Sequence, residues 1–213
     1  MKIFAIVPVK RFENGKSRLA KVLSSAERIK LCELLLYDTL DTLKKTSIIS
    51  KVIVVSSDVR AEKIAKKYDI KFLKENTDSG VNAAVAFADD YCSEARATAT
   101  IVIPQDLPLL LPEDIDRMCE FATEYEKCLV ICPSLRFDGS NALLRKPSML
   151  LQTHYDNNSY QTHLKVAREL GVNIKVVLSQ RIMIDLDTVE DVQNLIKESS
   201  THKAVKYLKS TVQ

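Results

Sequence analysis

Residues 3–9 read IFAIVPV, and this apolar run meets the cations Lys10 and Arg11 at its end. It has the length of a β-strand and is apolar throughout, which is typical of a strand buried on both faces of a parallel sheet. The run contains a proline and precedes no small-residue cleavage site, so it lacks the form of a signal peptide. We therefore predict that residues 3–9 form a central strand.

Further runs of strand length alternate with stretches of helical periodicity along the chain. Strands are predicted at residues 51–56, 70–73, 99–103, 128–132, 172–178 and 182–186. Helices are predicted after Ser24–Ser25 and at residues 59–68, 81–91, 112–123, 149–153, 159–170 and 188–197. Repeated strand–helix–strand units indicate parallel strands covered by helices. The expected α/β fold is a single-domain three-layer sandwich with a mostly parallel, mixed central sheet.

The chain shows no linker or internal repeat, so we expect one domain over residues 1–197. Within it, residues 133–158 break the regular pattern, with a hairpin or an extended excursion around Asp138–Gly139, and this region is a candidate dimerisation surface. Residues 198–213 are expected to be a polar, partly ordered C-terminal tail.

Composition excludes several classes of function. The 213 residues include four glycines, against about 15 at ordinary usage. Their wide spacing excludes the glycine-rich phosphate loops of P-loop and dinucleotide-binding proteins. A net charge of +3 with few aromatic residues argues against a nucleic-acid partner. Five cysteines without a CxxC pair suggest reduced thiols and a cytoplasmic protein, and no apolar run reaches the ~18 residues of a membrane span.

In parallel sheets, ligands bind beyond the carboxyl ends of the strands, so the residues after each strand are the candidates for chemistry. The first such loop combines four cations with a serine and a glycine, which suits a polyphosphate clamp better than a merely solvated loop. These residues are Lys10, Arg11, Gly15, Lys16, Ser17 and Arg18.

Three aspartates lie at the ends of other predicted strands or just after them. Asp106 stands between a buried strand and a turn rich in proline, several residues before the helix that it would otherwise cap. Asp185 and Asp187 are two residues apart on an extended segment, so their side chains point the same way, and like charges this close favour a cation. Mg²⁺ prefers one or two carboxylates together with phosphate oxygens and water.

Two polar groups lie in the irregular region, at residues 138–141 and 155–160. Ser159 stands at the predicted start of a helix, where free backbone N–H groups favour an anion, and His163 follows one turn later. Ordinary turn and cap chemistry is the alternative for both groups.

Taken together, these residues resemble the nucleotidyltransferases with a glycosyltransferase-A-like fold, and among them the 2-phospho-L-lactate guanylyltransferase family. The resemblance spans about residues 1–197. It rests on the order and spacing of IVPVK (6–10), KSRL (16–19), VNAA (81–84), QDLPLL (105–110), DGSNALL (138–144), NSY (158–160) before His163, and DLDT (185–188). Three departures from the family pattern are Gln105 and Asp156, each in place of a glycine, and Val81 in place of a leucine.

The resemblance implies transfer of GMP from GTP to 2-phospho-L-lactate or phosphoenolpyruvate, with release of pyrophosphate, in deazaflavin coenzyme biosynthesis. The partners would be GTP and a small phosphorylated three-carbon acid, with no nucleic acid or membrane, in a candidate homodimer. The alternatives are a molybdenum-cofactor or sugar-phosphate nucleotidyltransferase and, more remotely, a non-catalytic nucleotide-binding module.

The resemblance also implies roles for single residues. Mg²⁺ would be bound by Asp106, Asp187 and Asp185. Catalysis would fall to Lys10, Lys16 and Arg18, which hold the triphosphate. Nucleotide binding would involve Pro8, Lys10, Lys16, Ser17, Arg18 and Asn82. The acceptor would be bound by Ser140, Asn141, Ser159 and His163.

Overall fold

The computed structural model describes residues 1–212 as an α/β protein built on a seven-stranded sheet. The strands are β1 (Ile3–Pro8), β2 (Ile49–Ser56), β3 (Lys71–Lys74), β4 (Ala99–Val102), β5 (Cys128–Pro133), β6 (Ser140–Lys146) and β7 (Asn173–Val176). The longer helices are α1 (Ser25–Lys45), α2 (Val59–Lys67), α3 (Val81–Glu94), α4 (Pro112–Phe121), α5 (Ser159–Glu169) and α8 (Lys203–Thr211). Shorter helical segments are η1 (Phe12–Asn14), η2 (Ser17–Lys21), η3 (Ala122–Glu124), α6 (Gln180–Met183) and α7 (Val189–Leu195). The predicted mixed, mostly parallel sheet is confirmed.

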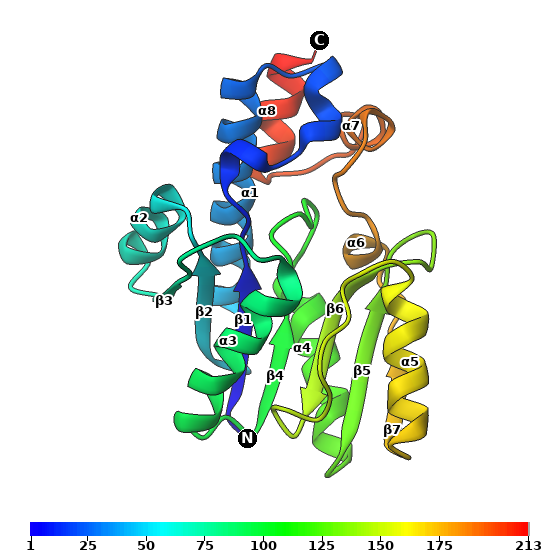
Figure 1. The fold of residues 1–213 in the computed structure, drawn as a ribbon. Coiled ribbons are helices and arrows are strands. Elements are labelled where there is room, and N and C mark those ends of the chain that lie inside the picture. The colour runs from blue at the N-terminus through cyan, green and yellow to red at the C-terminus, as the bar shows by residue number, and fades with distance from the viewer. Residues whose placement is uncertain (213) are drawn as a thin grey trace.

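The strand order is β3-β2-β1-β4-β6-β5-β7. Parallel pairs join β1 to β2 and β4, β2 to β3, and β5 to β7, whereas β6 runs antiparallel to both β4 and β5. The antiparallel β5–β6 hairpin is the excursion predicted around Asp138–Gly139. Because β6 runs in the opposite direction, its first residues lie at the same edge of the sheet as the last residues of β1 and β4 (Figure 1).

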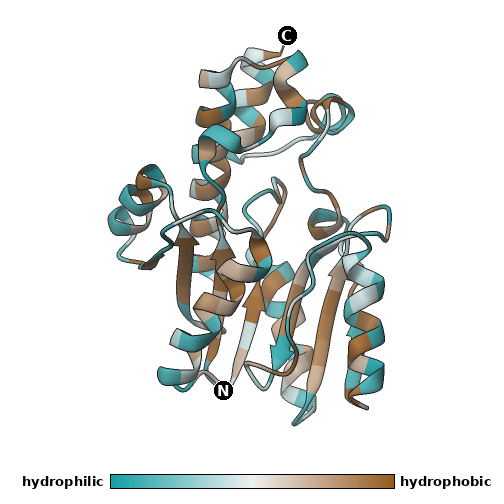
Figure 2. Cartoon of the chain, viewed as in Figure 1, coloured by the Kyte–Doolittle hydropathy of each residue, from teal (hydrophilic) through white to brown (hydrophobic). Residues whose placement is uncertain are grey.

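Alternating side chains of β1 enter two separate cores, one on each face of the sheet. Ile3, Ala5 and Val7 pack with residues of α1, α2 and α4, while Phe4 and Ile6 pack with residues of α3 and α5. All six residues of β1 are buried. Figure 2 shows the apolar strands between helices whose outer faces are polar. This is the three-layer arrangement expected of a strand that is apolar on both faces.

A third apolar cluster lies beyond the carboxyl ends of the strands, where α7, α8 and the start of α1 come together (Figure 1). The predicted polar tail was wrong for residues 203–211, which form α8 and bury Ala204, Val205 and Leu208. The carboxylate of Asp38 on α1 caps this helix by accepting from the backbone N–H groups of Lys203 at 3.0 Å and Ala204 at 2.8 Å. The segment is polar on average, but Ala204, Val205 and Leu208 recur at helical spacing and form an apolar face.

Two smaller predictions were also wrong. Residues 149–153 form turns rather than a helix, and residues 180–183 form α6 where a strand over 182–186 was expected. Ile182 and Met183 belong to α6 and are buried in the core that covers one face of the sheet. A short apolar run can therefore be the buried face of a helix, and its length alone does not identify a strand. The five cysteines are all buried and free, and none of the described helices is long and apolar enough to cross a membrane.

Candidate active site

A cavity of about 470 Å³ opens where the carboxyl ends of β1 and β4 meet the start of β6. Its wall includes eleven of the thirteen residues that sequence reasoning assigned to binding or catalysis: Pro8, Lys10, Lys16, Ser17, Arg18, Asp106, Ser140, Asn141, Ser159, Asp185 and Asp187. Its cationic side chains all come from the loop that follows β1. The other two predicted residues, Asn82 and His163, lie outside this wall.

The loop after β1 is held in place by a buried carboxylate. Asp58 accepts from the backbone N–H of Phe12 at 2.8 Å and also caps α2 through the N–H of Arg60 at 2.7 Å. Phe12 is itself completely buried. A side chain at Gly15 would place its Cβ 2.6 Å from the sulfur of Cys32, so only glycine lets the loop pass so close to α1. These contacts fix the approach of Lys16 to the cavity.

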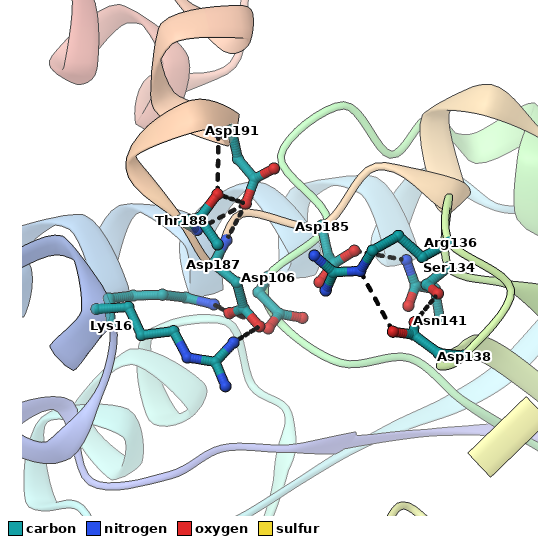
Figure 3. A network of polar contacts seen from close by, with 11 residues as sticks. Lys16, Asp106, Ser134, Arg136, Asp138, Asn141, Asp185, Asp187, Thr188 and Asp191 are labelled. Carbon is teal, nitrogen blue, oxygen red and sulfur yellow. Dashed lines mark hydrogen bonds and ion pairs between the residues drawn. The ribbon is translucent and has the colours of Figure 1, made fainter. Parts of the chain in front are cut away.

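Lys16 lies between two of the three predicted metal ligands (Figure 3). Its Nζ donates to Asp106 Oδ2 at 2.8 Å and to Asp187 Oδ1 at 2.9 Å, and its side chain is 7% exposed. Burial alone would lower the pKa of Lys16, but the two carboxylates outweigh it and raise the pKa. Burial would likewise raise the pKa of Asp187, but the charge of Lys16 keeps it below its usual value. Lys16 is therefore a fixed cation in contact with two carboxylates.

A backbone contact brings these carboxylates together from distant parts of the chain. The N–H of Leu186 donates to the carbonyl of Asp106 at 3.0 Å, so the segments around 106 and 186 run side by side. On the other side, Thr188 and Asp191 form the capping box that begins α7, and Asp191 Oδ2 also accepts from the N–H of Asp187 at 3.0 Å. This cap leaves the carboxylate of Asp187 to face the cavity.

Within residues 1–212, Asp185 forms no ion pair with a lysine or arginine, unlike Asp106 and Asp187. Its carboxylate accepts from Asn141 Nδ2 at 3.3 Å, and the residue borders the cavity. Burial, followed by the nearby charge of Asp106, raises the pKa of Asp185 to about 6, with Asp187 contributing in the same direction. An excess of negative charge at this point favours a bound cation.

The donor chemistry of the site fits Mg²⁺. Residues 1–212 contain no cluster of three ligands already arranged around one point, since Lys16 lies between Asp106 and Asp187. Mg²⁺ does not need such a cage, because it takes one or two carboxylates and completes its shell with phosphate oxygens and water. Asp106, Asp185 and Asp187 are the candidates to hold it.

Another part of the cavity wall comes from the starts of β6 and α5, where the side chains of Ser140, Asn141 and Ser159 are neutral, and from the loop with Asp156. Ser140 N–H donates to Ser159 Oγ at 2.8 Å, which links the two elements. Asn158 precedes α5 without a side-chain cap, so the first N–H groups of this eleven-residue helix have no partner from it. Asn141 Nδ2 donates to the carbonyls of Ile182 and Met183, and thereby fixes the segment that leads to Asp185.

Asn82 and His163 occupy positions different from those predicted. Asn82 was expected to help recognise the base, but its Oδ1 accepts from Tyr155 N–H at 2.7 Å and its Nδ2 donates to Asp156 Oδ2 at 3.1 Å. His163 was expected to bind the acceptor, but it is completely buried behind Ser140. Both side chains are held by protein groups, and neither borders the cavity.

Sequence reasoning missed two residues that shape the site. Asp58 escaped notice although it directly follows the apolar strand that ends in VVSS, the same position after a strand that identified Asp106. Tyr155 borders the cavity, and its ring packs edge-on against the ring of His163, with 5.3 Å between the ring centroids. No local pattern marks that contact, because it joins a loop to the far side of a helix.

Comparison with solved structures places the fold in a known class. A structure from Desulfovibrio desulfuricans G20, bearing the name of a nucleotide-diphospho-sugar transferase, superimposes with a TM-score of 0.79 at 16% identity, covering 99% of this chain and 95% of that one. At this identity the likeness shows a shared fold. The fold is therefore of the nucleotide-diphospho-sugar transferase type.

Sequence comparison is more specific. The model of the family described as "Guanylyl transferase CofC like" matches residues 1–212, so the chain belongs to this family of nucleotidyltransferases. A phosphoenolpyruvate guanylyltransferase of Conexibacter woesei is 32% identical over 195 residues, 92% of this chain and 87% of that protein. A 2-phospho-L-lactate guanylyltransferase of Methanobrevibacter smithii is 30% identical over 207 residues, 97% and 89% of the two chains.

Proposed function

We propose that this enzyme transfers GMP from GTP to a small phosphorylated three-carbon acid, 2-phospho-L-lactate or phosphoenolpyruvate, and releases pyrophosphate. The observation that carries the proposal is the division of the cavity wall. The loop after β1 brings Lys10, Lys16 and Arg18 to the cavity, and the starts of β6 and α5 bring the hydroxyls of Ser140 and Ser159. A triphosphate requires the first set of groups, and a small anionic acceptor suits the second.

The reaction requires positioning more than proton transfer. The second pKa of a phosphomonoester is near ~6, so the acceptor phosphate is mostly a dianion at neutral pH. One of its oxygens attacks the α-phosphorus of GTP, and the bond from that phosphorus to the β-phosphate oxygen breaks. The nucleophile therefore needs no general base, which agrees with a site whose histidine is buried behind the wall.

The cations of the loop after β1 act on the triphosphate. Lys10 and Arg18 are exposed at the cavity, where they reach a polyanion without first breaking a buried ion pair. Lys16 is held by two carboxylates, so its charge is already oriented before the pyrophosphate departs. Preorganised charge of this kind stabilises a transition state without reorganisation.

Mg²⁺ is the cofactor that we propose for this site, held by Asp106 and Asp187 with help from Asp185. When bound, it neutralises charge on the phosphate groups. Asn141 and the capping residues of α7 keep the segment from Asp185 to Asp187 in place for this task.

The acceptor is the part of the proposal that most needs an experiment. The test incubates the purified protein and Mg²⁺ with each nucleoside triphosphate and with phospholactate, phosphoenolpyruvate, a hexose 1-phosphate or molybdopterin, one at a time. Pyrophosphate release and the product mass are measured. We expect turnover with GTP and one of the two three-carbon acids. Turnover limited to a sugar phosphate or molybdopterin, or no turnover with any pair, would refute the proposal.

Three further expectations stay predictions: a place in deazaflavin coenzyme synthesis, a cytoplasmic location and a homodimer. For the dimer, the excursion from 133 to 158 remains the candidate surface. Leu135 and Phe137 at the tip of its hairpin are 61% and 43% exposed. Sedimentation velocity of the protein and of a Leu135→Ser variant tests the dimer. We expect a dimer that the substitution weakens, and an unsubstituted protein that sediments as a monomer would refute the prediction.

A further inference from the structure

We propose that His163 is a positioning residue that turns the hydroxyl of Ser140 into an oriented hydrogen-bond donor for the anionic acceptor. The proposal rests on the proposed function for the identity of the acceptor. The geometry does not depend on that function: it is a chain of hydrogen bonds from the backbone of the loop before α5, through His163, to the cavity wall.

The backbone fixes the tautomer of His163. The N–H of His154 donates to His163 Nε2 at 2.8 Å, so Nε2 must be the unprotonated nitrogen of the ring. A neutral imidazole then carries its hydrogen on Nδ1. That nitrogen lies 2.9 Å from Ser140 Oγ, and it is therefore the donor in this contact. The opposite tautomer would set two hydrogens against each other at Nε2.

The oxygen of Ser140 consequently acts as an acceptor inside the protein. It receives the Nδ1–H of His163 at 2.9 Å and the hydroxyl of Ser159 at 3.3 Å. A hydroxyl has two acceptor lone pairs and one hydrogen, so both lone pairs are occupied. Within the described part of the chain, no acceptor receives the hydrogen of Ser140, and this residue borders the cavity. The hydrogen is thus available to a phosphate or carboxylate oxygen.

The surroundings of His163 keep this arrangement neutral and rigid. The side chain is completely buried, and the ring of Tyr155 packs edge-on against it. Burial, with smaller effects of His154 and Arg145, lowers the pKa of His163 to about 4. A neutral, fixed ring suits a group that aligns a serine, since a wall without side-chain cations must bind an anion through well-placed neutral donors.

Two amide variants separate the two nitrogens of the ring. In His163→Gln, the amide takes the place of Nε2, so its oxygen can accept from the N–H of His154 while the contact to Ser140 is lost. In His163→Asn, the amide takes the place of Nδ1, so its NH₂ can donate to Ser140 while the N–H of His154 loses its acceptor. We expect His163→Gln to raise the acceptor KM about tenfold with a nearly unchanged Tm.

His163→Asn should give the reverse pattern, with a lower Tm and an acceptor KM within about threefold of the parent. The GTP KM should stay within about twofold for both variants, and His202→Gln, at a histidine far from the cavity, serves as the control. A purely structural histidine would make the acceptor KM follow the Tm. That result would overturn the proposal.

A double-mutant cycle with Ser140→Ala tests whether the two residues act as a unit. If His163 works through Ser140, adding His163→Gln to Ser140→Ala should change the acceptor KM by less than about twofold. Additive losses would contradict the proposal.

A separate measurement does not depend on turnover. NMR of the protein with ¹⁵N-labelled histidine at pH 7 should show His163 neutral and protonated at Nδ1. An Nε2-protonated or charged ring would refute the assignment even if the enzyme works as proposed. Conversely, a protein without turnover that shows the Nδ1 tautomer would refute the proposed function and leave this geometry standing.

Discussion

The two walls of the cavity offer an anion different kinds of partner. The wall built from the loop after β1 and the carboxylate segments carries full charges, with Lys16 in contact with Asp106 and Asp187. The wall built from β6 and α5 offers hydroxyls and an amide, with Ser140 and Ser159 hydrogen-bonded to each other. Both walls face substrates that carry several negative charges.

The difference follows from what each wall must do during the reaction. We call the wall with Lys16, Asp106 and Asp187 the nucleotide wall, and the wall with Ser140 and Ser159 the acceptor wall. Negative charge builds up on the departing pyrophosphate, so cations and the proposed metal suit the nucleotide wall. The acceptor phosphate is the nucleophile, and a directly bonded cation would withdraw electron density from the attacking oxygen. Neutral donors hold such an anion with less effect on its reactivity. The comparison predicts that charge changes on the nucleotide wall alter turnover strongly, whereas those on the acceptor wall alter acceptor affinity modestly.

The largest effect is expected at the proposed metal site. Asp106→Asn should lower turnover at least ~100-fold, because it would weaken binding of the proposed Mg²⁺, which would stabilise charge in the transition state. GTP affinity measured without metal should change little. Asp90→Asn, at an exposed position on α3, is the matched control. Near-normal pyrophosphate release by Asp106→Asn at saturating Mg²⁺ would remove this residue from the mechanism.

A graded loss should follow along the loop after β1. Lys16→Ala should reduce kcat/KM for GTP about 10- to 100-fold, because a buried, charge-assisted contact is lost and two carboxylates remain without their counter-ion. Arg18 is 70% exposed and 4.0 Å from Asp187, so Arg18→Ala should cost only several-fold. Arg11 does not border the cavity, and Arg11→Ala should change kcat/KM less than about twofold. Equal, small effects in all three variants would contradict a role of this loop in binding GTP.

These residues also mark how far sequence reasoning could reach. The loop and Asp106 were predictable because they follow apolar strands, and parallel strands end at one edge of the sheet. The pair Asp185/Asp187 was predictable from its two-residue spacing on an extended segment, although the element before it is the helix α6 and not the expected strand. The ion pairs of Lys16 were not predictable, since they join residues 16, 106 and 187 through the backbone contact between Leu186 and Asp106. Local patterns carry no information on which segments lie side by side.

The acceptor wall was predicted less well for a related reason. His163 lies one helical turn after Ser159, and this spacing alone places both on one face of α5. Whether that face meets a cavity or another element depends on the loop before the helix, whose His154 N–H binds the ring and draws it inward. The same limit applies to the C-terminal segment, where the acceptor of the α8 cap is a buried aspartate more than 160 residues earlier.

A stability measurement probes the uncompensated charge at Asp185. Burial and the charges of Asp106 and Asp187 raise its pKa to about 6 in the folded protein, above the ordinary value of 3.8. At pH 7 the carboxylate therefore destabilises the folded state without a metal, and this cost falls as the pH drops through 6 and disappears only well below 3.8, where the group is protonated in both states. Asp185→Asn should increase the free energy of unfolding at pH 7 by about 1–2 kcal/mol, with a difference that shrinks toward zero well below pH 3.8.

Urea unfolding without divalent cations measures this pH dependence. Asp138→Asn is a control of opposite sign, because the hydroxyl of Ser134 lowers the pKa of Asp138, so its loss should not stabilise the protein at pH 7. A variant Asp185→Asn that is less stable than the parent at pH 7 would mean that Lys16 or Arg18 already balances the charge of Asp185.

The smallest effect is expected at Asp156, the one carboxylate on the acceptor wall. It borders the cavity and accepts from Asn82 Nδ2 at 3.1 Å, in an exposed hydrogen bond that contributes little to stability. The carboxylate of Asp156 would repel a phosphorylated acid bound beside it. The hydrogen bond from Asn82 weakens this repulsion, because it partly neutralises the charge on the accepting oxygen. Asp156→Gly should therefore leave the acceptor KM unchanged or lower it up to about threefold, and Asp156→Asn should match it, since both remove the charge. A strong loss of activity in both variants would give Asp156 a positive role, as a metal ligand for example, and the acceptor wall would then also work by charge.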